Sequence, residues 1–215
     1  MKVLIVGANG QIGRHIVQRL AKQEKHQVTA MIRKQEQADF FNHLGVETVI
    51  ADLETEDGVL KAAEDVDAII FTAGSGGHTG ADKTMLVDLD GAFKSIEAAE
   101  KHHIKRFIMV SALHSDTPKN WKEGMEAYYT AKKRADERLR NSSLNYTILR
   151  PGWLTNEKPS GKIEAKLDLG KDGSISRENV ADIAVQALDI DATFNQTIEL
   201  IDGDTTINEA LSSIK

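Results

Sequence analysis

Three residues in the middle of the chain, Ser111, Tyr128 and Lys132, have the types and the spacing of a proton-transfer site. Tyr128 and Lys132 are four residues apart in a segment expected to be helical, so their side chains share one face. A nearby ammonium group stabilises a phenolate, and we therefore expect Lys132 to lower the pKa of Tyr128. Such a phenol can exchange a proton with a carbonyl or alcohol while Ser111 hydrogen-bonds the same oxygen.

A second pair with the same spacing, Tyr129 and Lys133, is displaced by about 100° around the same helix. Periodicity does not distinguish this register from Tyr128 with Lys132. A tyrosine and a lysine four residues apart also occur on many helices that carry no chemistry, so a purely structural role is the alternative for either pair.

A glycine-rich turn near the N-terminus is the second candidate site. Gly7 allows a sharp turn, Gly10 leaves room for a phosphate, and Gly13 lets the following helix pack closely on its strand. The N-terminus of that helix directs free N–H groups at an anion. The spacing predicts a strand, a turn and a helix that bind a nucleotide pyrophosphate, and the alternative is a turn without a ligand. Apolar residues flank the turn at Val3 to Val6 and at Ile12, Ile16, Val17 and Leu20.

Arg33 follows the second predicted strand, where a fold of this kind selects its cofactor. An acidic residue there would bind the ribose hydroxyls of NAD, whereas an arginine can pair with the 2′-phosphate of NADP. Residues 28–35 contain no acid, so the sequence favours NADP(H) over NAD(H). The alternative is a solvated arginine in an exposed turn.

Asp52 and Leu53 end the third predicted strand, where an adenine ring would lie. The carboxylate can accept a hydrogen bond from the exocyclic amine while Leu53 packs on the ring. The alternative for Asp52 is a cap on the following helix.

Small residues follow the fourth predicted strand, with Ala73, Gly74 and Ser75 at the start of the loop. Their size lets the backbone approach the sugar or nicotinamide of a cofactor. A loop without a ligand is the alternative, and His78 in the same loop is expected to be inert.

Strand-like and helix-like segments alternate along the chain, which predicts an α/β fold with a doubly wound parallel sheet and helices on both faces. One amphipathic helix is expected to bury Met85, Leu89, Phe93, Ile96 and Ala99, and a second to bury Ala127, Ala131, Ala135 and Leu139. Residues 152–176 are expected to be loop-rich, with a short hairpin around Ile163 to Leu167. A helix from Arg177 to Leu188, a strand from Thr197 to Ile201 and a helix from Ile207 follow. The other strands are expected at residues 3–6, 28–32, 46–51, 68–73, 106–111 and 146–150.

Length and composition limit the class of protein. The chain has 215 residues, a size typical of one domain, and its charged residues give a net charge of −6. This charge argues against nucleic acid or an anionic membrane as the main partner. The chain has no cysteine, which excludes disulfides and thiolate sites, and no acidic cluster suggests a metal. A cytoplasmic protein that acts on a small molecule is the expectation, and its oligomeric state is left open.

Several motifs together resemble the atypical short-chain dehydrogenase/reductase family of the NAD(P)H-binding type. The resemblance extends over essentially the whole chain and implies a Rossmann fold, a bound dinucleotide and a substrate pocket formed by the loops after the fifth and sixth strands. The motifs that carry it lie at residues 7–13, 33, 51–53, 106–111, 128–132, 146–152 and 177–181.

The resemblance implies roles for individual residues. The glycine turn falls on Gly7, Gly10 and Gly13, the cofactor-selecting position on Arg33, and the catalytic set on Ser111, Tyr128 and Lys132. Lys132 would also hold the ribose hydroxyls. The remaining cofactor contacts are expected at Asn9, Gln11, Ile12 and Pro151, the last beside the nicotinamide.

Three functions agree with these features. The first is an NADPH-dependent oxidoreductase that reduces a small carbonyl, quinone or flavin-like acceptor. The second is a dinucleotide-binding redox sensor without turnover. The third is an epimerase or isomerase that retains its cofactor. The chain lacks the large C-terminal lobe of a typical sugar-nucleotide epimerase, and residues 1–215 are expected to form one nucleotide-binding domain whose residues 152–176 and C-terminal segment face the substrate.

Overall fold

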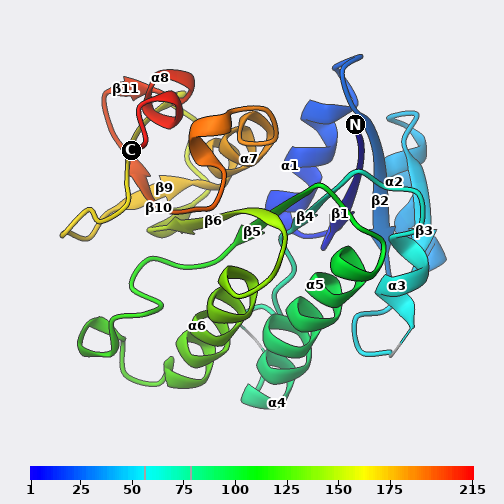
Figure 1. The fold of residues 1–215 in the computed structure, drawn as a ribbon, viewed down its shortest axis with the longest axis horizontal. Coiled ribbons are helices and arrows are strands. Elements are labelled where there is room, and N and C mark those ends of the chain that lie inside the picture. Colours follow the sequence, from blue (N-terminus) through cyan, green and yellow to red (C-terminus); the bar gives the residue numbers. More distant parts are fainter. Residues whose placement is uncertain (56, 78) are drawn as a thin grey trace.

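A nine-stranded sheet runs through the protein in a computed structural model that describes residues 1–55, 57–77 and 79–215 (Figure 1). Its strand order is β11-β8-β10-β6-β5-β4-β1-β2-β3. The strands from β10 to β3 are parallel, while β8 is antiparallel to β10 and to β11. The strands are β1 Lys2–Val6, β2 Gln27–Ile32, β3 Glu47–Ile50, β4 Ala68–Phe71, β5 Arg106–Val110, β6 Asn145–Pro151, β8 Lys162–Lys166, β10 Gln196–Asp202 and β11 Thr205–Thr206.

Helices cover both faces of this sheet, as predicted for a doubly wound α/β fold. One face carries α1 Gln11–Leu20, α2 Ala38–Asn42, α7 Arg177–Gln186 and α8 Ile207–Ser212, and the other carries α3 Gly58–Ala62, α5 Gly91–Lys101 and α6 Glu126–Arg140. Shorter helical segments are α4 Ala81–Lys83 and the turns at Gln35–Gln37, Pro118–Asn120 and Asp191–Thr193. None of the helices in the described ranges combines the length and the apolar character needed to cross a bilayer.

Alternation along the buried strands produces two hydrophobic layers. In β1, Val3 and Ile5 contribute to the layer under α1 and α7, whereas Leu4 and Val6 contribute to the layer under α5 and α6. Successive side chains of a strand point to opposite faces, so a continuous apolar run is required where both faces are covered.

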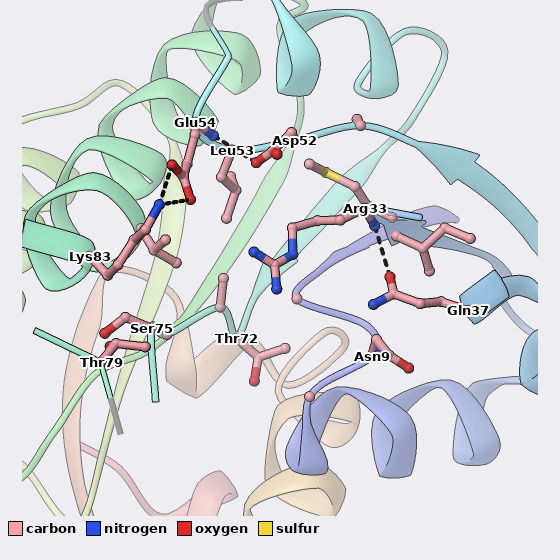
Figure 2. A pocket seen from close by; sticks show the side chains of 18 residues that line it. Asn9, Arg33, Gln37, Asp52, Leu53, Glu54, Thr72, Ser75, Thr79 and Lys83 are labelled. Carbon is pink, nitrogen blue, oxygen red and sulfur yellow. Dashed lines mark hydrogen bonds and ion pairs between the residues drawn. The ribbon is translucent and has the colours of Figure 1, made fainter. Parts of the chain in front are cut away.

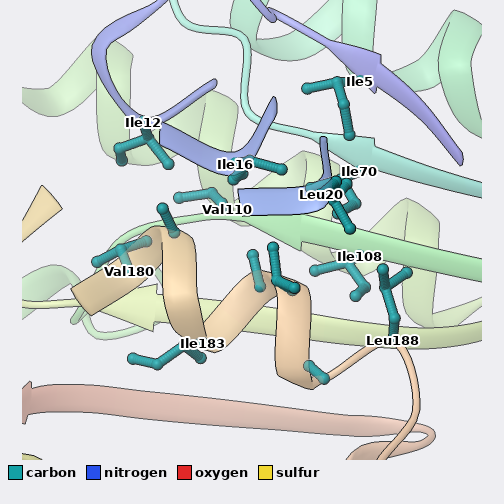
Figure 3. Close-up of a cluster of buried hydrophobic side chains, with 14 of the residues drawn as sticks. Ile5, Ile12, Ile16, Leu20, Ile70, Ile108, Val110, Val180, Ile183 and Leu188 are labelled. Atoms are coloured by element: carbon teal, nitrogen blue, oxygen red, sulfur yellow. The ribbon is translucent and has the colours of Figure 1, made fainter. Parts of the chain in front are cut away.

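The helices α1 and α7 pack against each other over the first layer (Figure 3). Ile12 and Ile16 lie in the same cluster as Val180 and Ile183. Ser176 caps α7 by accepting a hydrogen bond from the Asn179 N–H at 3.1 Å. This packing fixes the helix that begins at the glycine turn.

A π-helix at Thr84–Asp90, labelled η2 here, lies between α4 and α5. It changes which side chains are buried: Met85 is 43% exposed, and Thr84 and Asp88 are buried instead. The prediction that Met85 belongs to the buried stripe was therefore wrong. A π-turn contains an extra residue, so the 3.6-residue period used for the prediction does not hold across it.

Residues 152–176 are more regular than predicted. They contain β8 and a parallel pair of strands, β7 Trp153–Thr155 and β9 Ser174–Ser176. The strand expected within residues 163–167 is present as β8. The prediction of a hairpin was wrong, because β8 pairs with β10 and β11. Its partner lies some thirty residues later in the chain, and local turn signals carry no information about such pairing.

Candidate nucleotide-binding and catalytic site

A cavity of about 370 Å³ opens at the carboxyl ends of β1 to β4 (Figure 2). It lies where the strand order reverses between β1 and β4, which is the usual ligand position in a doubly wound sheet. Its walls include nine of the residues predicted to bind the cofactor: Gly7, Asn9, Gly10, Arg33, Asp52, Leu53, Ala73, Gly74 and Ser75.

The glycine turn has the local geometry that its spacing predicts. Gly7 has a φ of 86°, and a Cβ there would lie 2.6 Å from the Ala73 nitrogen. Gly10 precedes the first turn of α1 and donates its N–H to the Gly7 carbonyl at 3.0 Å. A Cβ at Gly13 would lie 2.3 Å from the same carbonyl, so α1 approaches the turn as closely as glycine allows.

We expect Gly7→Ala to destabilise the protein by about 2–5 kcal/mol, because it adds backbone strain and a collision with the backbone of Thr72 and Ala73, just after β4. Gly76→Ala is the matched control. Gly76 has a similar φ of 88°, but no described atom lies within 4 Å of a Cβ there, so only about 1 kcal/mol of backbone cost is expected. Denaturant unfolding of the two variants measures the difference, and equal losses would contradict a steric role for Gly7.

Arg33 lies directly after β2, and its side chain extends into the space between Leu53, Thr72 and Asn9 (Figure 2). Its backbone N–H donates to the Gln37 side chain at 2.9 Å, which fixes the turn. Within the described parts of the chain, no carboxylate pairs with its guanidinium. An unpaired guanidinium at the cavity wall remains available to an anion.

The other end of the cavity carries an ion pair between Lys83 and Glu54, with an N–O distance of 2.6 Å. Asp52 accepts a hydrogen bond from the Glu54 N–H at 3.0 Å. The alternative prediction that Asp52 caps the following helix is wrong, because Asp57 occupies the position before α3 and the Asp52 side chain stabilises the turn instead. Leu53 is buried and contacts Gly91 of α5.

The loop after β4 connects the cavity to Asp88 of the π-helix. The Ser75 N–H donates to Asp88 Oδ2 at 2.9 Å, and the hydroxyls of Ser75 and Thr84 are 3.3 Å apart. A Cβ at Gly74 would lie 3.2 Å from Asp88 Oδ1, so a small residue is needed there. His78 lies outside the described residues.

Lys132 of α6 forms the next contact in this chain of interactions. Its Nζ lies 3.1 Å from Asp88 Oδ1, and both side chains are almost fully buried. The same Nζ lies 5.7 Å from the ring centroid of Tyr128. The structure therefore places Lys132 close to the Tyr128 ring and links it, through Asp88, to Ser75 of the cavity wall.

The second register, Tyr129 with Lys133, has a different environment. The Tyr129 ring stacks on Trp121 with a centroid separation of 5.6 Å and an interplanar angle of 13°. Lys133 is only partly buried, whereas Lys132 is 5% exposed. Tyr129 is thus part of the packing around Trp121, and the first register is the one whose lysine is linked through Asp88 to Ser75 of the cavity wall.

The pKa of Tyr128 is raised, although Lys132 was expected to lower it. Burial of the phenol is the largest cause, and Lys132 opposes it. Asp88 and Asp136 add further increases because their negative charges disfavour a phenolate. The effect of Lys132 thus has the predicted sign, but burial and the two carboxylates outweigh it, and the net rise in pKa keeps Tyr128 a neutral phenol at physiological pH.

Ser111 directly follows β5 and is buried next to a network of charged side chains. Asp136 Oδ2 accepts hydrogen bonds from Ser115 Oγ and Arg150 Nε, both at 3.0 Å. Arg150 also donates to Asp116 at 2.6 Å. In the part of the chain that the structure describes, Ser111 Oγ and Asp136 Oδ1 are buried without a hydrogen-bond partner.

Residues 7–191 match a protein family described as NAD(P)H-binding. The chain belongs to this family. The match extends well beyond the glycine turn and includes Arg33, Ser111, Tyr128 and Lys132. It confirms the predicted family and, with the parallel sheet, the Rossmann-type fold.

Individual members of the NAD(P)H-binding family are similar over almost the whole chain. The uncharacterized sugar epimerase YhfK of Bacillus subtilis (strain 168) is 50% identical over 215 residues, which is all of both chains. A structure from Bacillus halodurans, provisionally named an NAD-dependent epimerase/dehydratase, is 42% identical with a TM-score of 0.93 and covers 98% of each chain. ChuY, an anaerobillin reductase from Escherichia coli O157:H7, is 26% identical with a TM-score of 0.80 and covers 96% of this chain and 99% of its own.

The remaining predicted cofactor residues lie away from the cavity wall. The side chain of Ile12 is in the core between α1 and α7, and Gly13 packs against the turn. Gln11 faces a second, smaller cavity that also borders Arg14 and Arg177. Lys132 and Pro151 are buried and do not line the cavity.

Sequence reasoning missed Asp88 and Asp136. Asp136 follows Tyr128 and Lys132 at the same four-residue interval, so its position on the same helix face could have been recognised. Asp88 lies within an apolar pattern that the π-helix interrupts, and no local signal indicated its burial. In residues 1–55, 57–77 and 79–215, no group of three or more His, Asp or Glu side chains is arranged to hold a metal ion.

Proposed function

We propose that this protein is an NADPH-dependent oxidoreductase that reduces a small carbonyl, quinone or flavin-like acceptor. The observation that carries the proposal is the continuous contact from Ser75 in the cavity wall, through Asp88, to Lys132 beside Tyr128. This series of contacts connects the wall of the proposed dinucleotide cavity to Tyr128, the proposed proton donor. Membership of the NAD(P)H-binding family supports the cofactor class.

The described residues fit a dinucleotide. At Gly7 and Gly13 a Cβ would collide with backbone atoms, which indicates a turn held tightly against the start of α1. This turn leaves the wall open at Gly10 for a phosphate. Among the described residues no carboxylate pairs with the Arg33 guanidinium at the cavity wall, and two of its N–H donors suit the oxygens of a 2′-phosphate. These features support NADP(H) over NAD(H).

Bound NADPH would supply a hydride to the carbon atom of the acceptor. Tyr128 donates its proton to the acceptor oxygen, so that a carbonyl becomes an alcohol and the tyrosine becomes a phenolate. The Lys132 ammonium stabilises this phenolate until a solvent proton restores the phenol. Ser111 directly follows β5, and its hydroxyl would hydrogen-bond the same acceptor oxygen.

The test is net consumption of NADPH by the purified protein with panels of carbonyls, quinones and flavins. We expect the NADPH absorbance to fall with at least one acceptor and reduced product to accumulate in equal amount. Tight NADPH binding with no oxidation by any acceptor would contradict the proposal and support a sensor instead.

The raised pKa of Tyr128 predicts the pH dependence of turnover. Because the phenol is the proton donor, kcat should stay nearly constant from about pH 7 to 9 and fall only above about pH 10, the usual pKa of tyrosine. The measurement is a pH profile of kcat at saturating NADPH and acceptor. A fall that begins near neutrality would mean that bound ligands lower this pKa or that another group donates the proton.

An epimerase is the second candidate, because the 50% identical relative is named a sugar epimerase. Such an enzyme oxidises and re-reduces one substrate and therefore regenerates its cofactor. The same experiment separates the two functions. Epimerisation would leave NADPH and total NADP(H) unchanged while the stereochemistry of a sugar substrate changes, whereas reduction consumes one NADPH per product.

A further inference from the structure

Asp88 contacts both the cofactor cavity and the proton-transfer residues, and no sequence motif assigns it a role. We propose that Asp88 is a positioning residue for the reaction, which holds the Lys132 ammonium beside Tyr128 and ties it to Ser75 in the cavity wall. The inference rests on the proposed oxidoreductase function, in which Lys132 stabilises the Tyr128 phenolate.

Each oxygen of the Asp88 carboxylate has a separate partner. Oδ2 accepts from the Ser75 N–H at 2.9 Å, and Oδ1 lies 3.1 Å from Lys132 Nζ. The other contact of Nζ is weak, at 3.5 Å from the Val110 carbonyl oxygen. Across the described ranges, Asp88 is the carboxylate that lies within ion-pair distance of Lys132. The position of the ammonium group is therefore set mainly by Asp88.

Stability alone is a poor reason for this ion pair. Lys132 and Asp88 have side-chain exposures of 6% and 1%, so both charges are removed from water. The cost of removing them is often no smaller than their attraction, and an apolar pair of similar volume would stabilise the fold as well. A buried ion pair that borders a ligand cavity is more easily explained by chemistry.

Local backbone structure supports the same role. Asp88 lies in a π-helix, a rare conformation that occurs frequently at functional sites. The π-helix turns Thr84 and Asp88 inward, where both contact Ser75. Gly74 has no side chain, which lets the carboxylate approach the loop. The π-helix, the contacts with Ser75 and the missing side chain at Gly74 together determine where the Asp88 carboxylate lies.

The ion pair with Asp88 also determines the charge of Lys132. Burial alone would lower the pKa of Lys132, but attraction to Asp88, with contributions from Tyr128 and Asp136, raises it overall. Lys132 therefore stays charged while Tyr128 donates its proton. The charged groups that act on Tyr128 are Lys132 and Asp136 from α6 and Asp88 from η2.

The test is Asp88→Asn, which keeps the shape of the side chain and an acceptor for the Ser75 N–H but removes the charge. We expect kcat to fall at least tenfold, with the acceptor KM and the Kd of NADPH changed less than threefold. Asp90→Asn is the matched control, since Asp90 lies on the same helical segment and forms a partly exposed pair with Lys94 at 2.6 Å. This variant should retain wild-type kcat.

A second readout uses the free protein and needs no acceptor. Ultraviolet titration of the phenol, taken as the difference between each protein and its Tyr128→Phe counterpart, should show a higher pKa for Tyr128 in Asp88→Asn, because the Lys132 ammonium that stabilises the phenolate is no longer held beside it. Without a positioning role, the substitution would only remove the negative charge of Asp88, which lowers the pKa of Tyr128. If Asp88→Asn does not fold, Asp88→Ser replaces it, because the smaller hydroxyl can still accept from Ser75.

The possible failures are distinguishable. Unchanged kcat together with an unchanged or lower pKa of Tyr128 in the Asp88 variant, with Tyr128→Phe inactive, would overturn the role of Asp88 and leave the proposed function intact. Full turnover by Tyr128→Phe would overturn the proposed function itself.

Discussion

Tyr128→Phe should reduce kcat by about 10²–10⁴-fold, the range expected when a positioned proton donor is removed. The substitution deletes one hydroxyl from a largely enclosed ring and leaves Lys132 paired with Asp88 at 3.1 Å. We therefore expect the Kd of NADPH to change less than about twofold. Single-turnover kinetics with a saturating acceptor, alongside calorimetric titration with NADPH, measures the two effects separately.

The control for this variant is Tyr129→Phe on the neighbouring position of α6. Tyr129 stacks on Trp121, and Lys132 Nζ lies over the ring of Tyr128, so the Tyr129 hydroxyl should contribute little and kcat should stay within about threefold of wild type. A large loss in Tyr129→Phe together with normal turnover in Tyr128→Phe would show that the second register carries the chemistry.

Arg33→Ala should weaken NADPH binding by roughly 10–100-fold and leave NADH binding within about twofold. A hydrogen bond to a charged group contributes about 1.5–3 kcal/mol, which is about 10–100-fold in affinity, and the exposed Arg33 guanidinium, whose bonds to a 2′-phosphate compete with water, should contribute about this much in total. Truncation leaves no unpaired partner inside the protein, because the structure shows no carboxylate bound to this guanidinium in the described ranges. Calorimetry with both nucleotides gives the ratio directly.

Lys34→Ala is the matched control for Arg33→Ala. Lys34 is adjacent and exposed, and its ammonium group lies 3.8 Å from Glu36 rather than in the cavity wall. It should change the affinity for either nucleotide by less than about twofold, since an exposed ion pair contributes little. Equal losses of NADPH and NADH affinity in Arg33→Ala would mean that Arg33 supports the cavity without reading the 2′-phosphate.

The glycine turn and the parallel sheet were predictable because their signals are local. The sharp turn at Gly7 and the close packing at Gly13 follow from the absence of a Cβ, which a sequence records directly. Continuous apolar runs such as Val3 to Val6 indicate strands that are covered on both faces. Arg33 could be assigned to the cavity because it directly follows a strand whose end was already placed.

The strand β8 and the π-helix were not predictable from such signals. The partner of β8 is chosen by packing at the far edge of the sheet, so Ile163 and its neighbours gave no indication of a pairing with β10. In the π-helix, one extra residue per turn exchanges Met85 for Thr84 and Asp88 on the buried face. A fixed helical period cannot report that exchange.

The sequence by itself determined the fold class and the nucleotide turn and limited the candidate proton donor to Tyr128 or Tyr129, because spacing along one strand or one helix is sufficient for this much. Only the tertiary structure decided the protonation state of the site. Asp88 and Lys132 come from different helices, and the pKa of Tyr128 is raised by burial against the opposing charge of Lys132. Charge interactions depend on distance and on exclusion of water, and both quantities exist only after the chain has folded.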